Sequence, residues 1–119
     1  MFPSGMKWIK IFSAGQIPSD NSITKITAAG RKICIIRWEG KFYATQAYCP
    51  HAGADLSGGW CGEGKLICPY HRYSYDLKTG RGSEGQGDYL NTYPIEIRKE
   101  GLFVAVPEKW RFLKKLFRL

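Results

Sequence analysis

The sequence of 119 residues lacks several features that would assign it to large classes of protein. No apolar run reaches the length of about eighteen residues that a membrane-spanning helix needs. The opening residues, MFPSGMKWIKIF, lack the long apolar core of a secretory signal. No internal repeat and no helical period is found before residue 107. A membrane-spanning protein and a helical bundle are therefore not expected, and the length fits one domain.

Histidine and cysteine are scarce, with two and four residues respectively, and they are not scattered. Both histidines and three of the cysteines lie in the stretch CPHAGADLSGGWCGEGKLICPYH, from Cys49 to His71. Cys49-x-His51 opens the stretch, sixteen residues follow, and Cys68-x-x-His71 closes it. Two disulfides in a secreted protein would be the alternative use of four cysteines. Because the thiols stand beside imidazoles and no export signal is visible, we expect metal-bound thiolates in a reducing, cytoplasmic setting.

Most of the chain consists of short runs in which apolar and polar residues alternate, separated by turn residues. This period of two, with many β-branched and aromatic residues, predicts antiparallel strands. The expected strands are residues 8–12, 22–28, 32–38, 41–48, 65–69, 72–77, 92–99 and 102–107. The last two are joined by Glu100-Gly101 into a closing hairpin. Eight or so short strands predict an all-β sandwich or barrel.

Two thiolates and two imidazoles make a four-ligand metal set, and two kinds of centre compete for it. Zinc accepts such a set, but its sites are usually built from one Cys–Cys pair and one His–His pair. Here each pair is mixed, and the Cys-x-His spacing is tighter than a zinc finger normally uses. In a Rieske-type [2Fe–2S] cluster two cysteines hold one iron and two histidines hold the other. Two loops that each supply one cysteine and one histidine meet that need directly.

The segments CPHAGADLSGG and CPYHRYSYDLKTG resemble the two cluster-binding loops of Rieske-type ferredoxins, and the resemblance extends from about Lys7 to Pro107. It implies a Rieske-type antiparallel β-sandwich or barrel with a two-loop cluster-binding subdomain. It also implies that Cys49 and Cys68 hold the buried ferric iron. His51 and His71 would then hold the outer, reducible iron.

The sequence departs from the family pattern at several positions around these loops. Ala54 and Tyr70 stand where high-potential members have two further cysteines that form a disulfide. Tyr73 replaces a serine that often bonds to a bridging sulfide, whereas Tyr75 matches a tyrosine found near a ligand sulfur. Fewer hydrogen bonds to sulfur predict a potential in the lower part of the Rieske range, roughly −150 mV. Arg72 replaces a glycine, which puts an arginine where the backbone conformation suits glycine.

Other candidate groups have simpler interpretations. Cys34, inside the apolar run KICIIRW, is expected to be a buried small hydrophobe. Cys61 lies in the glycine-rich gap, and a ligand role for it is not needed because the set of four is complete. Gly80-x-Gly82-x-x-Gly85 matches the dinucleotide fingerprint, but no βαβ unit surrounds it, so we interpret it as a flexible loop.

The chain divides into a domain at residues 1–107 and a tail at 108–119. The tail carries five basic residues and one acidic residue, which is half of the net charge of +8. Its apolar residues share one helical face and predict a short C-terminal amphipathic helix. They are Phe112, Leu113, Leu116 and Phe117. Three roles remain open: packing on the domain or on a second copy, docking on a partner, or contact with an anionic membrane surface.

The expected function is one-electron transfer from a reductase to a terminal oxidoreductase such as a ring-hydroxylating oxygenase. A non-haem oxygenase iron needs two further histidines and a carboxylate, and both histidines are already used, so the chain is not expected to be an enzyme by itself. No nucleic-acid partner is expected. Two alternatives are kept: the small Rieske subunit of a larger enzyme such as nitrite reductase, and a zinc-stabilised interaction module. The oligomeric state stays open.

Overall fold

A computed structural model describes residues 5–50, 53–70 and 72–107, and these residues are almost entirely β-structure. In this part of the chain ten strands and two single-turn 3-10 helices follow one another. The elements are β1 (Met6–Ser13), η1 (Ala14–Gln16), β2 (Ser22–Ala28), β3 (Arg31–Trp38), β4 (Lys41–Gln46), η2 (Leu56–Gly58), β5 (Trp60–Gly62), β6 (Lys65–Ile67), β7 (Ser74–Asp76), β8 (Thr92–Tyr93), β9 (Ile95–Arg98) and β10 (Gly101–Pro107).

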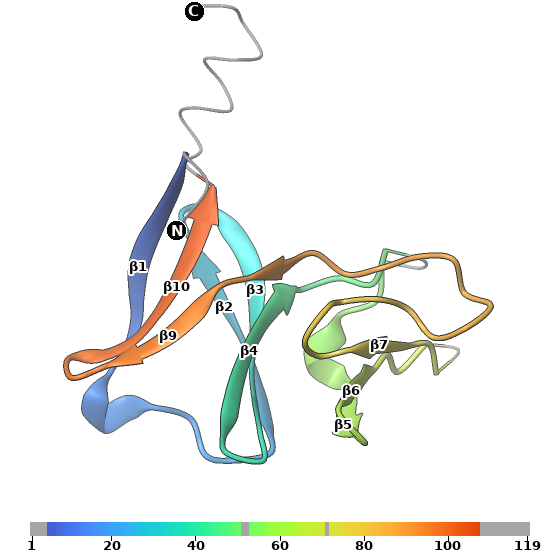
Figure 1. The fold of residues 1–119 in the computed structure, drawn as a ribbon, viewed down its shortest axis with the longest axis horizontal. Helices are drawn as coiled ribbons and strands as arrows, with labels where there is room; N and C mark the ends of the chain where they lie inside the picture. Colours follow the sequence, from blue (N-terminus) through green and yellow to red (C-terminus); the bar gives the residue numbers. More distant parts are fainter. Residues whose placement is uncertain (1–4, 51–52, 71, 108–119) are drawn as a thin grey trace, which may run out of the picture.

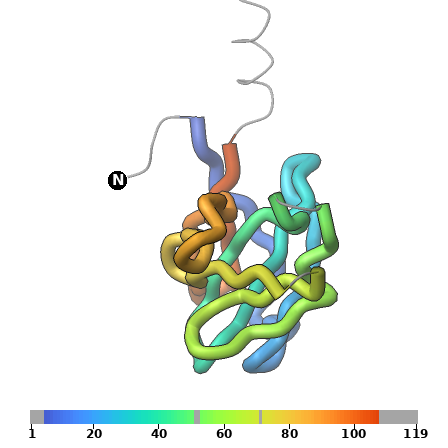
Figure 2. Tube along the Cα trace, turned by 90° about the vertical axis from the view of Figure 1, so that its right-hand side faces the viewer, coloured from blue at the N-terminus to red at the C-terminus, as the bar shows by residue number. Residues whose placement is uncertain are grey.

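The strands form three antiparallel sheets with the orders β1-β10-β9, β2-β3-β4-β8 and β5-β6-β7. The first two sheets lie together as a basal unit (Figure 1). The third sheet is a separate, smaller unit, reached from the end of β4 and left towards β8. In the view turned by 90°, the chain of this smaller unit crosses in front of the basal strands (Figure 2). The predicted antiparallel β-architecture with a separate loop-bearing unit is confirmed.

Three of the hairpins use the same turn chemistry. Ala29-Gly30, Glu39-Gly40 and Glu63-Gly64 each form a two-residue connection in which both residues have positive φ, between +50° and +78°. Two consecutive positive φ angles define the type I′ turn, whose twist matches that of the flanking strands. The glycine is needed at the second position because it adopts a positive φ without steric cost. These turns fix the register of β2–β3, β3–β4 and β5–β6.

Strand β3 is buried on both faces and connects two hydrophobic cores. Ile33 and Ile35 belong to the core inside the basal unit, together with Leu102, Val104 and Val106 of β10. Cys34 and Ile36, on the opposite face, belong to the core under the small sheet. Burial on both faces explains why the strand reads as a continuous apolar run rather than an alternating one. Cys34 is fully buried, as predicted.

The boundaries of the strands next to the cluster loops differ from the prediction. β4 ends at Gln46 and β6 ends at Ile67, so both cysteine loops start earlier than the alternation of residues indicates. β7 begins only at Ser74, so the second loop also ends later. β5 was not predicted, because its sequence WCG carries no period in only three residues. No helix in the described ranges has the length and apolar composition required to cross a membrane. The amphipathic helix predicted at 108–119 lies outside the described residues.

The glycine-rich segment after β7 is a loop, as predicted, but it is more tightly held than the flexible loop that the sequence indicated. Gly80 N–H donates to the Asp76 carbonyl and Leu90 N–H donates to the Gly80 carbonyl, both at 2.7 Å. A Cβ at Gly80 would lie 2.1 Å from the Leu90 oxygen, so only glycine permits this approach. Gly82 N–H donates to the Asp88 carbonyl at 2.9 Å. The glycines therefore allow two stretches of backbone to pack directly on each other.

Candidate metal centre

The first cysteine loop follows β4 and is closed at its base by backbone hydrogen bonds. Cys49 N–H donates to the Ala54 carbonyl, and Gly53 N–H donates back to the Cys49 carbonyl, both at 2.8 Å. Two residues further out, Leu56 N–H donates to the Ala47 carbonyl at 2.8 Å. Gly53 has φ +70°, which lets the chain reverse within this short distance. The backbone N–H and the backbone carbonyl of Cys49 are therefore both held by hydrogen bonds.

The second cysteine loop joins β6 to β7 and is closed in the same way. Cys68 N–H donates to the Tyr73 carbonyl at 2.7 Å. In each loop the cysteine N–H is thus bonded to the carbonyl of the fifth residue after it. In sequence, His51 stands between Cys49 and Ala54, and His71 stands between Cys68 and Tyr73. Both histidines lie outside the described residues, so their predicted ligand role stays a prediction.

The two loops bring the two cysteine sulfurs together in a buried position. Cys49 is 3% exposed and Cys68 is fully buried. Burial, backed by the neighbouring Cys49 thiol, raises the pKa of the Cys68 thiol. Two cysteine sulfurs side by side in a buried position are favoured as thiolates only when a positive charge lies close to them. A metal ion supplies that charge, and the pair of soft donors fits an iron–sulfur centre or zinc.

Both sulfurs are within hydrogen-bond distance of neighbouring groups. The Tyr70 N–H donates to Cys68 Sγ at 3.4 Å. The hydroxyl of Tyr75 lies 3.3 Å from Cys49 Sγ, where the resemblance placed a tyrosine near a ligand sulfur. Tyr75 itself is completely buried and also donates to Asp88 Oδ2 at 3.1 Å. The contact with Asp88 was not predicted.

The remaining two cysteines do not join this pair. Burial raises the pKa of the Cys34 thiol to about 12 and that of the Cys61 thiol to about 11, so both are held in the protonated form. Among the described residues no set of three or more cysteine, histidine or acidic side chains is placed to hold a metal ion. Cys61 therefore does not complete a site with Cys49 and Cys68. All four cysteines have free thiols.

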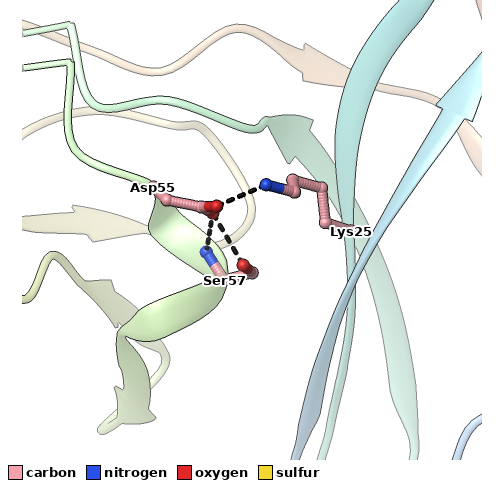
Figure 3. Close-up of polar contacts among 3 residues, drawn as sticks. All are labelled: Lys25, Asp55 and Ser57. Atoms are coloured by element: carbon pink, nitrogen blue, oxygen red, sulfur yellow. Dashed lines mark hydrogen bonds and ion pairs between the residues drawn. The ribbon is translucent and has the colours of Figure 1, made fainter.

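An ion pair that sequence reasoning missed ties the first loop to the basal unit (Figure 3). Asp55 accepts hydrogen bonds from Ser57 N–H at 2.9 Å and from the Ser57 hydroxyl at 2.6 Å, which caps the 3-10 helix η2. The same carboxylate accepts from the ammonium group of Lys25, on strand β2. Lys25 also lies over the ring of Tyr48, at 5.3 Å from its centroid. The Asp-x-Ser spacing is a recognisable local cap, but nothing in the sequence indicates Lys25 as its partner.

This ion pair predicts a pH-dependent contribution to stability. The hydrogen bond from Lys25, followed by those from Ser57, lowers the pKa of Asp55 from 3.8 to about 2. The ionised carboxylate stabilises the folded state at pH values above 3.8, and that contribution is lost as the pH falls towards 2. The pair is solvent-exposed, so Asp55→Asn should lower the melting temperature by only a few degrees at pH 7. Melting curves recorded by circular dichroism should show this difference shrinking between pH 4 and pH 2.

The exposed Glu84 provides a matched control for this prediction. Glu84→Gln should leave the melting temperature unchanged at each pH. Added salt should reduce the Asp55→Asn difference, because it screens an exposed pair. An Asp55→Asn effect that persisted unchanged at pH 2 would mean that the ion pair is not its source.

Arg72, in the second loop, has the left-handed backbone conformation that suits the glycine usual at this position of the family. Its φ is +56°, in the left-handed region where a side chain is disfavoured by about 1 kcal/mol. Arg72→Gly should therefore raise the free energy of unfolding by about 0.5 kcal/mol, after the greater entropy of glycine in the unfolded chain is deducted. Urea unfolding of the purified protein measures the difference.

A second variant separates the backbone from the charge. Arg72→Ala removes the positive charge but keeps a Cβ at positive φ, so it should give no gain in stability. Equal stabilisation by the glycine and alanine variants would assign the effect to loss of the charge instead.

Comparisons with known proteins agree with this geometry. Residues 7–94 match the Rieske [2Fe-2S] domain. The ferredoxin component of the naphthalene 1,2-dioxygenase system of Pseudomonas aeruginosa is 28% identical over 82% of this chain and 94% of its own length. A nitrite reductase of Emericella nidulans is 29% identical over 93% of this chain, which corresponds to 12% of that larger protein.

A solved structure supports the same assignment. It is the complex of reduced oxygenase and oxidised ferredoxin in carbazole 1,9a-dioxygenase, and one of its chains superposes with a TM-score of 0.74 at 25% identity, covering 86% of this chain and 95% of that one. The two hydrogen-bonded loops, the paired buried thiols and the match over residues 7–94 point to one conclusion. The chain belongs to the Rieske [2Fe-2S] domain family.

Proposed function

We propose that Cys49, His51, Cys68 and His71 hold the [2Fe–2S] cluster and that the chain carries single electrons from a reductase to a terminal oxidoreductase such as a ring-hydroxylating oxygenase. The observation that supports the ligand set most directly is the meeting of the Cys49 and Cys68 sulfurs between two identically closed loops. The sequence supplies one histidine to each loop. When bound, a cluster with this ligand set accepts and returns one electron.

The residues around the cysteines exclude water and fix the ligands. Leu56, Leu66 and Tyr75 are fully buried in the core beneath the loops. The backbone hydrogen bonds at the base of each loop fix the position of the two cysteines. This arrangement fits electron transfer rather than substrate turnover.

The relatives support an electron-transfer component rather than a catalytic subunit. The Pseudomonas relative is named as the ferredoxin component of a dioxygenase system, and the solved complex pairs a ferredoxin with an oxygenase. By this analogy the terminal partner is an oxygenase component, the donor is a reductase, and the setting is cytoplasmic. A basic tail at 108–119 that docks or packs remains part of the proposal on sequence grounds alone.

A second candidate has a specific observation in its favour. Almost the whole chain aligns with a short part of the Emericella nitrite reductase. The chain would then act as the small Rieske subunit of a larger enzyme. Affinity capture of the tagged protein followed by mass spectrometry separates the two. Recovery of a reductase and an oxygenase supports the first candidate, whereas recovery of a larger nitrite reductase chain supports the second.

Metal and redox analysis tests the centre itself. We expect two irons and two acid-labile sulfides per chain, reduction by one electron, and a midpoint potential in the lower Rieske range, roughly −150 mV. The zinc-stabilised module makes the opposite prediction of one zinc ion, no sulfide and a colourless protein. A single zinc per chain would end the electron-transfer proposal.

A further inference from the structure

Tyr75 stands between two acceptors and has one hydrogen to give. Its hydroxyl lies 3.3 Å from Cys49 Sγ and 3.1 Å from Asp88 Oδ2. When Cys49 binds iron it does so as a thiolate, which has no proton and can only accept. An ionised carboxylate also only accepts, and its oxygen is a stronger acceptor than sulfur. The two acceptors therefore compete for the same O–H.

Asp88 is held in this position by a short chain of hydrogen bonds that returns to the strand carrying Tyr75. Its other oxygen, Oδ1, accepts from Gln86 Nε2 at 3.2 Å. The Gln86 amide is itself oriented, because its Oε1 accepts from the Ser74 N–H at 3.0 Å. Ser74 precedes Tyr75 on β7. These hydrogen bonds fix the position of the Asp88 carboxylate against the Tyr75 hydroxyl.

We infer that Asp88 is a positioning residue that lowers the reduction potential of the centre by taking the Tyr75 hydrogen away from the Cys49 sulfur. A hydrogen bond to a ligand sulfur stabilises the reduced, more negative state and raises the potential. Withholding that bond has the reverse effect. The inference rests on the proposed role of Cys49 as a ligand, and it adds a residue outside both cluster loops to the machinery that sets the potential.

Asp88→Asn tests this inference well, because the neighbouring Gln86 amide determines how the new asparagine amide is oriented. Gln86 presents its N–H₂ group, so the amide oxygen at position 88 must face Gln86, and the amide N–H₂ must face Tyr75. The Tyr75 oxygen then becomes an acceptor. Its hydrogen is released to Cys49 Sγ. We expect the equilibrium constant for one-electron reduction to rise about tenfold, an upward shift of about 59 mV in midpoint potential.

Removal of a negative charge also raises the potential, so the experiment needs a cycle of variants. Midpoint potentials are measured for the wild type, Asp88→Asn, Tyr75→Phe and the double variant, all loaded with cluster. Tyr75→Phe alone should change the equilibrium constant for reduction less than threefold, because the Tyr75 hydroxyl of the wild type donates to Asp88 and not to the Cys49 sulfur. In the Tyr75→Phe background the effect of Asp88→Asn should shrink to the charge contribution alone. Glu84→Gln, in the same loop and exposed, controls for a general charge effect.

Two results would overturn the inference. An equal upward shift, or none, from Asp88→Asn in both backgrounds would leave no role for the Tyr75 hydrogen. A tenfold fall from Tyr75→Phe alone would mean that the hydroxyl already donates to sulfur, and this result decides the question even if Asp88→Asn fails to retain its cluster. Failure of the ligand assignment looks different, because the wild-type protein itself would then lack two irons and two sulfides per chain.

Discussion

Cys49→Ala and Cys68→Ala should each abolish cluster binding, whereas Cys61→Ala should leave it intact. Each of the first two removes a soft donor from a buried pair that no other described cysteine can replace. Cys61 is the matched control, because it is a thiol on the neighbouring strand β5 that packs against the same core. We expect iron and acid-labile sulfide to fall at least tenfold in the first two variants.

Iron and sulfide analysis, with the visible absorption of the oxidised protein, gives the result directly. Far-ultraviolet circular dichroism is recorded alongside, because loss of the metal clamp lowers the stability of a small domain. Loss of the cluster in Cys61→Ala would place Cys61 in the ligand set. Retention of the cluster in Cys49→Ala would remove Cys49 from it.

The sequence predicted those parts of the fold that depend on neighbours along the chain. The hairpin after residue 99 is marked by Glu100-Gly101, most strands are marked by alternating apolar and polar residues, and β3 is marked by its β-branched apolar run. The cysteine loops could be recognised for the same reason, since each Cys–His pair spans no more than four positions. Strand β5 was not predicted, because three residues are too few to show a period of alternation.

Two contacts around the cysteine loops could not be predicted, because they join segments that are distant in the sequence. Lys25 and Asp55 are thirty positions apart, and Tyr75 and Asp88 are thirteen apart. Lys25 and Asp55 meet because the first cysteine loop packs against strand β2 of the basal unit. In the sequence nothing distinguishes Asp88 from an ordinary surface carboxylate. Its position against a buried tyrosine follows from glycine-mediated packing of the loop after β7, which no local pattern encodes.

Gly59→Ala should destabilise the small sheet strongly, because this glycine lets the two cysteine loops approach each other. Gly59 follows η2, and its neighbour Trp60 pairs with Ile67, the residue before Cys68. A Cβ at position 59 would lie 2.1 Å from the Ile67 carbonyl oxygen, far inside van der Waals contact. With φ at −87°, the backbone itself accepts alanine, so the conflict is purely steric. To relieve this clash, β5 must move away from β6 beside Ile67, the residue before Cys68.

The expected cost is about 3 kcal/mol in the free energy of unfolding, with reduced iron content, because the displaced Ile67 carries Cys68 with it. Gly58→Ala is the matched control: its nearest neighbour would be Pro69 Cγ at 3.9 Å, an ordinary contact, and it should be neutral within about 0.5 kcal/mol. Urea unfolding and iron analysis of both variants measure the contrast. Similar behaviour of the two would show that the approach of β5 to β6 is not what holds the cysteine loops together. A large loss of iron in Gly59→Ala alone would show that the metal centre depends on the close backbone contact between Gly59 and Ile67. Gly59 lies one position before β5, the strand that the sequence did not predict.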